Sequence, residues 1–223
     1  MATTSLARVR VDDSMATRAY QDIKRRIIDG TIPAGYPLLE TELAAQLDIS
    51  RTPVREALAR LKHDGLAVSL GRKGIFASSL SASDMEEIYE MLEGLESMAV
   101  KLAAQRATEE DIRRLEEAVA AQKEALARDD LPEWIAADEA FHSIILAAAQ
   151  NRQIQEVVSR VNDQLRRVRR LTIRARRHLD ASTAMHEATF HAIRDRDGNL
   201  ARDLNQRHRA DARKEMIAIL RSA

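Results

Sequence analysis

The pattern of apolar and polar residues changes near residue 80, from short mixed elements to continuous helix. Residues 1–13 are polar without a regular apolar period, which predicts a flexible arm. Apolar residues with helical spacing run from Ala16 to Ile28, and the Gly and Pro residues of "DGTIPAGYPL" end that helix. A short helix in "ETELAAQL", the turn "DIS" and a longer helix in "RTPVREALARLKHDG" follow. Ser50 or Thr52 is the expected N-cap of the longer helix.

The next segment alternates between apolar and polar residues. "LAVSLGRKGIFAS" has a Gly-Arg-Lys-Gly tip, which predicts a two-stranded hairpin. Two helices joined by a three-residue turn and followed by a hairpin form a winged helix-turn-helix, which reads DNA with its second helix. We therefore predict a DNA-binding domain over residues 14–78 and a linker, "SLSAS", over residues 79–83.

The remaining residues, 84–223, carry only helical periodicity. Ser83 with Glu86, and Thr108 with Asp111, have the spacing of capping boxes, which predicts helices to about Gln105 and Ala127. Four further helices are predicted over residues 132–149, 152–178, 181–196 and 198–220. The predicted fold class is therefore mainly α, with an N-terminal winged helix-turn-helix plus a C-terminal all-α bundle of six helices.

Composition narrows the classes of function. The chain has no Cys, which excludes a disulfide framework, a thiolate metal site and a cysteine nucleophile. No apolar run approaches the ~18 residues that span a bilayer, and the N-terminus lacks a signal-peptide pattern, so a cytoplasmic protein without a membrane partner is predicted. The net charge is zero, but residues 14–78 hold ten Lys and Arg against seven Asp and Glu, which fits a nucleic-acid partner there.

The start of the second helix carries side chains suited to DNA. Arg51 and Arg55 can form bidentate hydrogen bonds with guanine, and the hydroxyls of Ser50 and Thr52 suit phosphates. Two arginines alone are also compatible with a small helical domain whose arginines are merely solvated. The longer string "ELAAQLDISRTPVREALARLKHDGL", followed by "GRKGIFAS", resembles the winged helix of GntR-type transcriptional regulators.

That resemblance covers about Ala16 to Ser78 and implies a homodimer on inverted-repeat, double-stranded operator DNA. It implies base or phosphate contacts by Arg51 and Arg55 and a wing that enters the minor groove at Gly71. Thr41 stands where some family members have a DNA-contacting Arg. The expected DNA-binding residues are Thr41, Ser50, Arg51, Thr52, Arg55, Gly71, Arg72 and Lys73.

The helical half has a resemblance of its own. The strings "EIYEMLEGLESMAVKLAAQRATEEDI", "DDLPEWIAADEAFHSIILAAAQN" and "MHEATFHAIRDRDGNLARDLNQRH" resemble the FCD effector domain, which marks the FadR subfamily of GntR regulators. Six helices rather than seven are typical of its VanR-like branch. The resemblance implies an effector-binding and dimerisation domain over residues 84–223, in a regulator rather than an enzyme.

Four residues of this half indicate a metal site. Asp138 and His142 lie four residues apart on one face of an apolar helix. Burying a carboxylate and an imidazole there costs roughly several kcal/mol unless another group pairs with them. His186 and His208 are in phase with apolar residues of the fifth and sixth helices of the bundle. One carboxylate and three imidazoles suit Zn²⁺, Ni²⁺ or Mn²⁺, and metal-binding FCD domains keep their ligands at these positions. His191 is predicted to lie on another face.

An arginine-rich segment between Arg166 and Arg177 could serve the effector. Arg169 and Arg176 flank its buried stripe, and Arg169 is the better candidate for a carboxylate near the metal. The family implies small organic or sugar acids that release a repressor from DNA. Leu92 stands where many FCD domains have an Arg, which removes one common carboxylate anchor.

Three functions remain open at this point. The first is a regulator that responds to a metal-anchored acid, and the second is a regulator for which the metal itself is the effector. The third is a metalloenzyme that uses the three-His, one-Asp site. A catalytic metal needs an open position and a nearby acid or base, and no further acid or His is found in phase with the four candidate ligands.

Overall fold

The computed structural model describes residues 3–79 and 81–222. It divides into two compact units, which are described separately. One unit comprises Met1–Leu80 with Arg160–Arg170, and the other comprises Ser81–Ser159 with Leu171–Ala223. None of the helices in the described ranges combines the length and the apolar character needed to cross a membrane.

The first unit contains three helices, α1 (Thr3–Ile28), α2 (Glu40–Leu47) and α3 (Arg51–His63). Residues 3–13, which the sequence predicts as a flexible arm, are therefore helical. They contain neither Gly nor Pro, and extending an existing helix costs less than nucleating a new one. The three helices share one apolar core, whose fully buried side chains include Ile23, Leu58 and Leu61.

The turn between α2 and α3 and the hairpin that follows match the sequence prediction. Asp48 ends α2 in the left-handed conformation (φ 53°), which Asp tolerates better than most residues. Strands β1 (Ala67–Ser69) and β2 (Ile75–Ala77) pair in antiparallel register, with Val68 opposite Phe76. A single 3₁₀ turn, η1 (Gly71–Lys73), joins them. The observed order is that of a winged helix-turn-helix.

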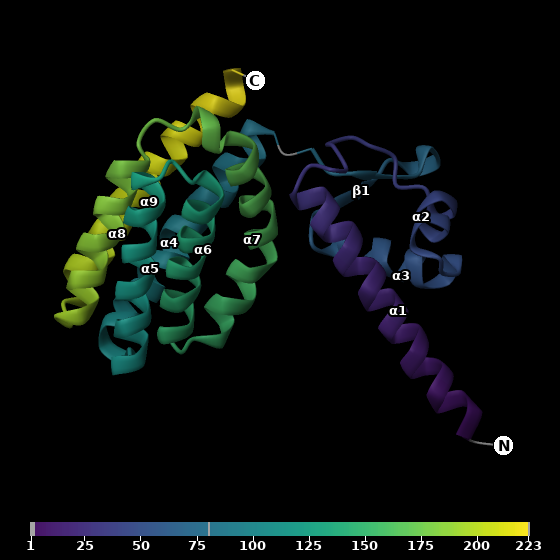
Figure 1. Ribbon diagram of the computed structural model, residues 1–223, viewed down its shortest axis with the longest axis horizontal. Helices are drawn as coiled ribbons and strands as arrows, with labels where there is room; N and C mark the ends of the chain where they lie inside the picture. The colour runs from purple at the N-terminus through teal and green to yellow at the C-terminus, as the bar shows by residue number, and fades with distance from the viewer. Residues whose placement is uncertain (1–2, 80, 223) are drawn as a thin grey trace. The chain divides into compact units, whose positions relative to one another are not determined.

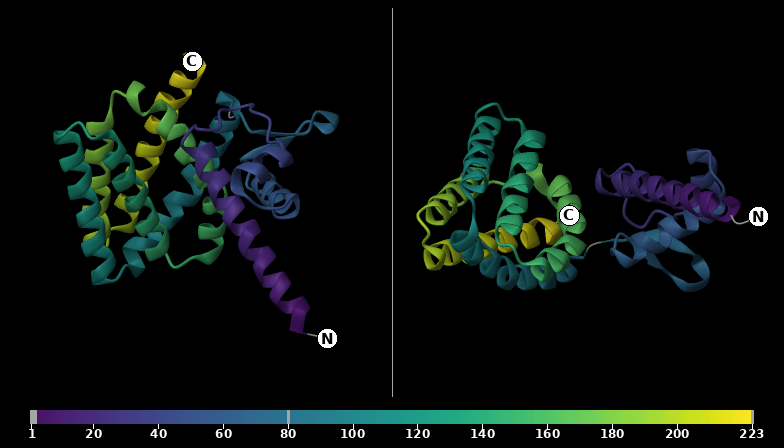
Figure 2. Two further views of the ribbon diagram at one scale, coloured as in Figure 1. Left: turned by 45° about the vertical axis from the view of Figure 1, so that its right-hand side comes forward. Right: turned by 90° about the horizontal axis from the view of Figure 1, so that it is seen from below.

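The second unit contains the predicted helical bundle (Figures 1 and 2); of its six helices, the fourth is shared, because Arg160–Arg170 of that helix group with the first unit. Its core includes Phe141 and Ile145 of the third helix and Phe190 and Ile193 of the fifth. The helices are α4 (Ala82–Arg106), α5 (Glu109–Ala127), α6 (Leu131–Ala148), α7 (Arg152–Thr172), α8 (Leu179–Arg194) and α9 (Gly198–Ser222).

One predicted cap and one predicted helix end differ from the structure. Ser81 with Asp84 forms the capping box of α4, not Ser83 with Glu86, because two such boxes overlap in this serine-rich segment and the earlier one closes. Thr108 and Asp111 cap α5 as predicted.

The helix predicted over residues 152–178 ends at Thr172 and continues as the 3₁₀ turn η2 (Ile173–Ala175). Arg176 then becomes extended (φ −71°, ψ 133°). Glu215 stabilises this conformation, because it accepts hydrogen bonds from the backbone N–H of Arg177 (2.8 Å) and from Nε of Arg176 (2.9 Å). A tertiary contact therefore ends the helix before its sequence pattern does.

Candidate DNA-reading helix and metal centre

Helix α3 presents the predicted DNA-binding side chains because its other face is buried. Val54, Leu58 and Leu61 pack into the core of the first unit, which turns Arg51 and Arg55 outward. Ser50 is the N-cap residue by backbone conformation (φ −70°, ψ 166°), although its side chain makes no capping hydrogen bond. All eight predicted DNA-binding residues are exposed.

A carboxylate that the sequence patterns did not reveal is hydrogen-bonded to both arginines at the start of α3. Glu40, the first residue of α2, accepts hydrogen bonds from Arg51 (3.1 Å) and from Nε and Nη2 of Arg55 (3.0 Å each). The hydrogen bonds from Arg55, more than any other contact, lower the pKa of Glu40. The pairing holds both arginines against the start of α2.

The tip of the hairpin has the geometry of a wing. Gly71 and Gly74 adopt positive φ angles (58° and 104°), which glycine adopts without the steric cost of a side chain. Arg72 and Lys73 lie between them and are exposed. A tip that pairs two bare glycines with two cations can approach a phosphate backbone closely.

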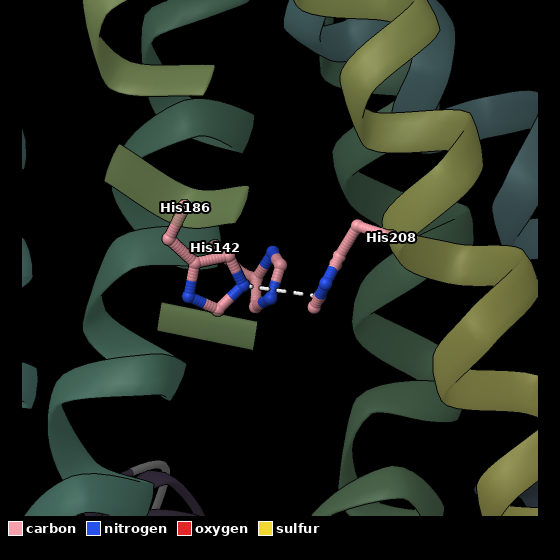
Figure 3. Close-up of side chains that lie close together, drawn as sticks. All are labelled: His142, His186 and His208. Carbon is pink, nitrogen blue, oxygen red and sulfur yellow. Dashed lines mark hydrogen bonds between the residues drawn. The ribbon is translucent and has the colours of Figure 1, made fainter. Parts of the chain in front are cut away.

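The three predicted metal-binding histidines come together from three helices of the second unit (Figure 3). His142 lies on α6, His186 on α8 and His208 on α9, and all three are buried. Their candidate ligand nitrogens all lie within 4.8 Å of one another, and the Nε2 atoms of His186 and His208 are 3.0 Å apart.

The cluster of nitrogens within 4.8 Å comprises the three histidines, and the fourth predicted ligand, Asp138, lies beside it. Oδ1 of Asp138 is 3.7 Å from Nε2 of His142 and 3.8 Å from Nε2 of His186. The side chain of His191 is 44% exposed and lies 3.9 Å from Glu187, outside the cluster. The helical phase along the sequence was therefore sufficient to distinguish His191 from the clustered histidines.

A buried glutamine fixes the orientation of one imidazole. Nδ1 of His186 is 2.7 Å from Oε1 of Gln122 on α5, and the amide nitrogen of Gln122 donates to the carbonyl of Ala137 (3.5 Å). Because the amide oxygen can only accept, Nδ1 carries the proton and Nε2 presents its lone pair to the cluster. Gln122 is fully buried, and a buried amide within the apolar stripe of α5 is the signal that could have identified it.

The electrostatics of the cluster favour neutral imidazoles at His142 and His208. Burial is the largest cause that lowers the pKa of His142 well below its usual value, and the charge of Arg209 adds to it. Burial likewise lowers the pKa of His208, followed by the charge of His186. Neutral imidazole is the form that binds a metal. The donor set of three imidazoles and one carboxylate, with one nitrogen already directed by Gln122, thus fits a divalent ion.

A cavity of about 630 Å³ borders the cluster. Met185 and several alanines form its apolar wall, and His208 connects it with the other two histidines. Its polar side chains are Arg176, Arg177, His178, Ser182, Asp211, Lys214 and Glu215.

Of the two candidate arginines from the sequence, Arg169 and Arg176, it is Arg176 that lines the cavity. It bonds to Glu215 and Ser182, and its guanidinium carbon lies 5.6 Å from the ring centroid of Trp134. Trp134 is buried and donates a hydrogen bond to Thr183 (2.9 Å). Arg169 is buried on α7, in the segment that groups with the first unit, and is not part of this lining. The break after Thr172 brings Arg176 to the cavity.

Known proteins resemble both halves of the chain. The FCD domain family matches residues 87–211, and the family described as bacterial regulatory proteins, gntR family, matches residues 15–77. An uncharacterized HTH-type transcriptional regulator in the TAR-I ttuE-ttuC' intergenic region of Agrobacterium vitis is 44% identical over 134 residues. That alignment covers 59% of this chain and 78% of the relative.

Two further proteins are similar over most of the chain. The HTH-type transcriptional repressor RspR of Escherichia coli is 25% identical over 180 residues, which are 81% of this chain and 79% of RspR. A crystal structure of a GntR-type transcriptional regulator from Rhodococcus sp. RHA1 superimposes with a TM-score of 0.76 at 26% identity. It covers 92% of this chain and 98% of the Rhodococcus chain.

Proposed function

Because the chain belongs to the gntR family of bacterial regulatory proteins and carries an FCD domain, it is a DNA-binding transcriptional regulator rather than an enzyme, and we propose that it is a repressor. A small carboxylate, bound beside a metal ion in the FCD domain, releases it from operator DNA. The similarity of the chain to the transcriptional repressor RspR supports the repressing role.

The DNA half of the proposal assigns the recognition role to α3. The exposed Arg51 and Arg55 at its N-terminal end contact base edges in the major groove, while Ser50, Thr52 and Thr41 contact phosphates. The tip formed by Gly71, Arg72 and Lys73 follows the adjacent backbone.

Replacing Arg55 with Ala should relax sequence preference at one operator position, because a bidentate arginine–guanine contact is worth about 1–3 kcal/mol. Replacing Lys73 with Ala should instead weaken binding to all sequences alike and reduce the slope of log K against log salt by about 1. Fluorescence anisotropy with operator variants over a salt series measures both effects. An Arg55→Ala protein that retains wild-type preference would show that α3 does not read the bases as proposed.

We further propose that the repressor is a homodimer whose two readers bind an inverted repeat. A single winged helix offers too few contacts for operator affinity, and closed two-fold symmetry is the common solution. Sedimentation velocity on the full-length protein should give about twice the chain mass of 25.0 kDa at micromolar concentration. A monomer both alone and with operator DNA would contradict this arrangement.

One observation carries the effector half of the proposal, namely that His208 belongs both to the histidine cluster and to the cavity wall. Asp138, His142, His186 and His208 would hold a divalent ion such as Zn²⁺, Ni²⁺ or Mn²⁺. A bound ion supplies a positive, Lewis-acidic centre for the oxygen atoms of a carboxylate. Arg176 lies on the wall of the same cavity, where a second polar group of the effector could reach it.

Operator release tests this half directly. Metal-loaded protein on labelled operator is titrated with a panel of organic and sugar acids, and the metal-stripped protein is titrated in parallel. We expect release by one acid from the metal-loaded protein, and a higher melting temperature with the same acid because a ligand specific for the folded state stabilises it.

Direct metal sensing is the second candidate function. It would use the same histidines, which an ion could reach through the cavity that His208 lines. The same titration separates the two candidates. Release of the metal-stripped protein by added ion alone would favour metal sensing, whereas a response that needs both ion and acid favours the acid-responsive repressor.

A further inference from the structure

A buried ion pair lies against the metal centre and has no part in the function described so far. Glu96 on α4 and Arg209 on α9 are 4% and 2% exposed, and they pair directly with each other. Nη2 of Arg209 is also 3.1 Å from Nδ1 of His142, and Oε2 of Glu96 is 4.0 Å from the same nitrogen. One ring nitrogen of a candidate ligand therefore faces both members of a buried charge pair.

The contact with Arg209 determines which nitrogen of His142 carries the proton. A guanidinium can only donate hydrogen bonds, so Nδ1 of His142 must be the acceptor. The proton of the neutral ring then lies on Nε2, the nitrogen that faces Oδ1 of Asp138 at 3.7 Å. His142 is in this respect the opposite of His186, whose Nδ1 already donates to Gln122.

A metal ligand needs the other arrangement. Nε2 of His142 and Nε2 of His186 face the same carboxylate oxygen of Asp138, so Nε2 is the nitrogen that His142 offers to the centre. To offer its lone pair, the ring must carry its proton on Nδ1, where it needs an acceptor. The carboxylate of Glu96 lies beside Nδ1 and can be that acceptor, whereas Arg209 is a competing donor.

We propose that Glu96 and Arg209 are positioning residues, and that the hydrogen-bond partner of Nδ1 of His142 changes from Arg209 in the metal-free state to Glu96 in the metal-bound state. In the metal-free state Arg209 donates to Nδ1 and keeps the ring in the tautomer that does not bind a metal. In the metal-bound state Glu96 accepts the Nδ1 proton while it remains paired with Arg209, so neither buried charge is left unpaired. This inference rests on the metal site of the proposed function.

The exchange gives metal binding a mechanical consequence within the second unit. Glu96 and Arg209 connect α4 with α9, and α4 begins at Ala82, directly after the segment that follows the winged helix. A change in how this pair is held alters the packing between the two helices. The pair is thus placed to report occupancy of the site to the start of the FCD domain.

Metal affinity of the full-length protein tests the proposal, with Zn²⁺ as the probe and a chromophoric chelator as competitor. Glu96→Gln should weaken Zn²⁺ binding about 10–100-fold, the usual effect of removing a partner of a ligand. Arg209→Met removes the competing donor and should leave the affinity unchanged or raise it. Glu90→Gln is the matched control, because Glu90 forms another α4–α9 ion pair, with Arg213 (3.2 Å), without contacting a histidine.

The opposite directions separate positioning from a merely structural role, in which both variants would lose affinity together. Equal losses in Glu96→Gln and Arg209→Met, or wild-type affinity in Glu96→Gln, would overturn the exchange and leave the proposed function standing. Absence of Zn²⁺ binding by the wild-type protein would overturn both.

A second measurement uses the wild-type protein and needs a variant only to assign the signals of His142. Imidazole ¹⁵N spectra of the metal-free wild-type protein, with His142 identified by its absence in His142→Gln, should show the proton on Nε2. Addition of Zn²⁺ should move it to Nδ1. A His142 ring protonated on Nδ1 before metal is added would contradict the exchange.

Discussion

Replacing His142 with Ala should abolish stoichiometric metal binding and lower the melting temperature of the protein. The substitution removes one of four proposed ligands and leaves Asp138, which is 3% exposed, without its cation. An ion present at 1,000 times its Kd stabilises the folded state by about 4 kcal/mol, and this contribution would be lost. Elemental analysis after gel filtration measures the metal, and differential scanning calorimetry measures the stability.

Two comparisons make this result specific. His191→Ala should retain metal and stability, because His191 lies outside the cluster. Operator binding should survive in His142→Ala while the response to the effector fails, because the histidine lies in the second unit. A His142→Ala protein that keeps a full equivalent of metal and responds normally would exclude the site.

The metal-free protein should lose stability steeply below about pH 6.5. Burial is the main cause that holds the pKa of His142 and of His208 well below the usual value; the charge of Arg209 lowers both pKa values further, and Asp138 opposes the shift. At these two histidines the unfolded chain therefore binds up to two more protons than the folded chain as the pH falls below the ordinary histidine pKa of about 6.5. Each such proton costs about 1.4 kcal/mol of stability per pH unit, so the free energy of unfolding should fall by roughly 2–3 kcal/mol between pH 7.5 and 5.5.

Urea unfolding of metal-stripped protein at the two pH values measures this difference. The stability is fully present above pH 6.5 and declines as the pH falls toward the lowered pKa values of the folded state. His208→Gln removes one of the two groups and should reduce the decline by about 1.4 kcal/mol. An identical pH dependence in the variant and the wild type would contradict the assignment.

Most of the fold followed from periodicity along the chain. The winged helix-turn-helix and the six helices of the bundle were predictable because each helix has a regular apolar face and a polar or glycine boundary. The end of α7 was not, because Arg176 and Arg177 leave the helix to meet Glu215, some forty residues away in sequence. The prediction of a flexible arm was wrong for residues 3–13, because a helix can propagate through a segment that has no apolar periodicity.

The candidate site was predictable to the extent that each ligand has a helical phase. Asp138 and the three histidines were identified because each polar residue interrupts an apolar face. Glu96, Gln122 and Arg209 interrupt apolar faces too. The prediction that no further acid accompanies the four candidate ligands was wrong for Glu96, because only the packing of α4, α5 and α9 against the histidines shows what these side chains contact. Glu40 lies eleven and fifteen residues from the arginines that it holds, a relation that no local spacing indicates.

The environment of Trp134 has a practical consequence for finding the effector. It is the only tryptophan of the chain, it is 1% exposed, and the Arg176 that lines the cavity lies against its ring. Its intrinsic fluorescence therefore originates from one shielded indole beside the proposed binding cavity. A compound that draws Arg176 away from the ring should change the emission of the unlabelled, unmodified protein. The protein thus carries its own optical probe, and candidate acids can be screened without operator DNA.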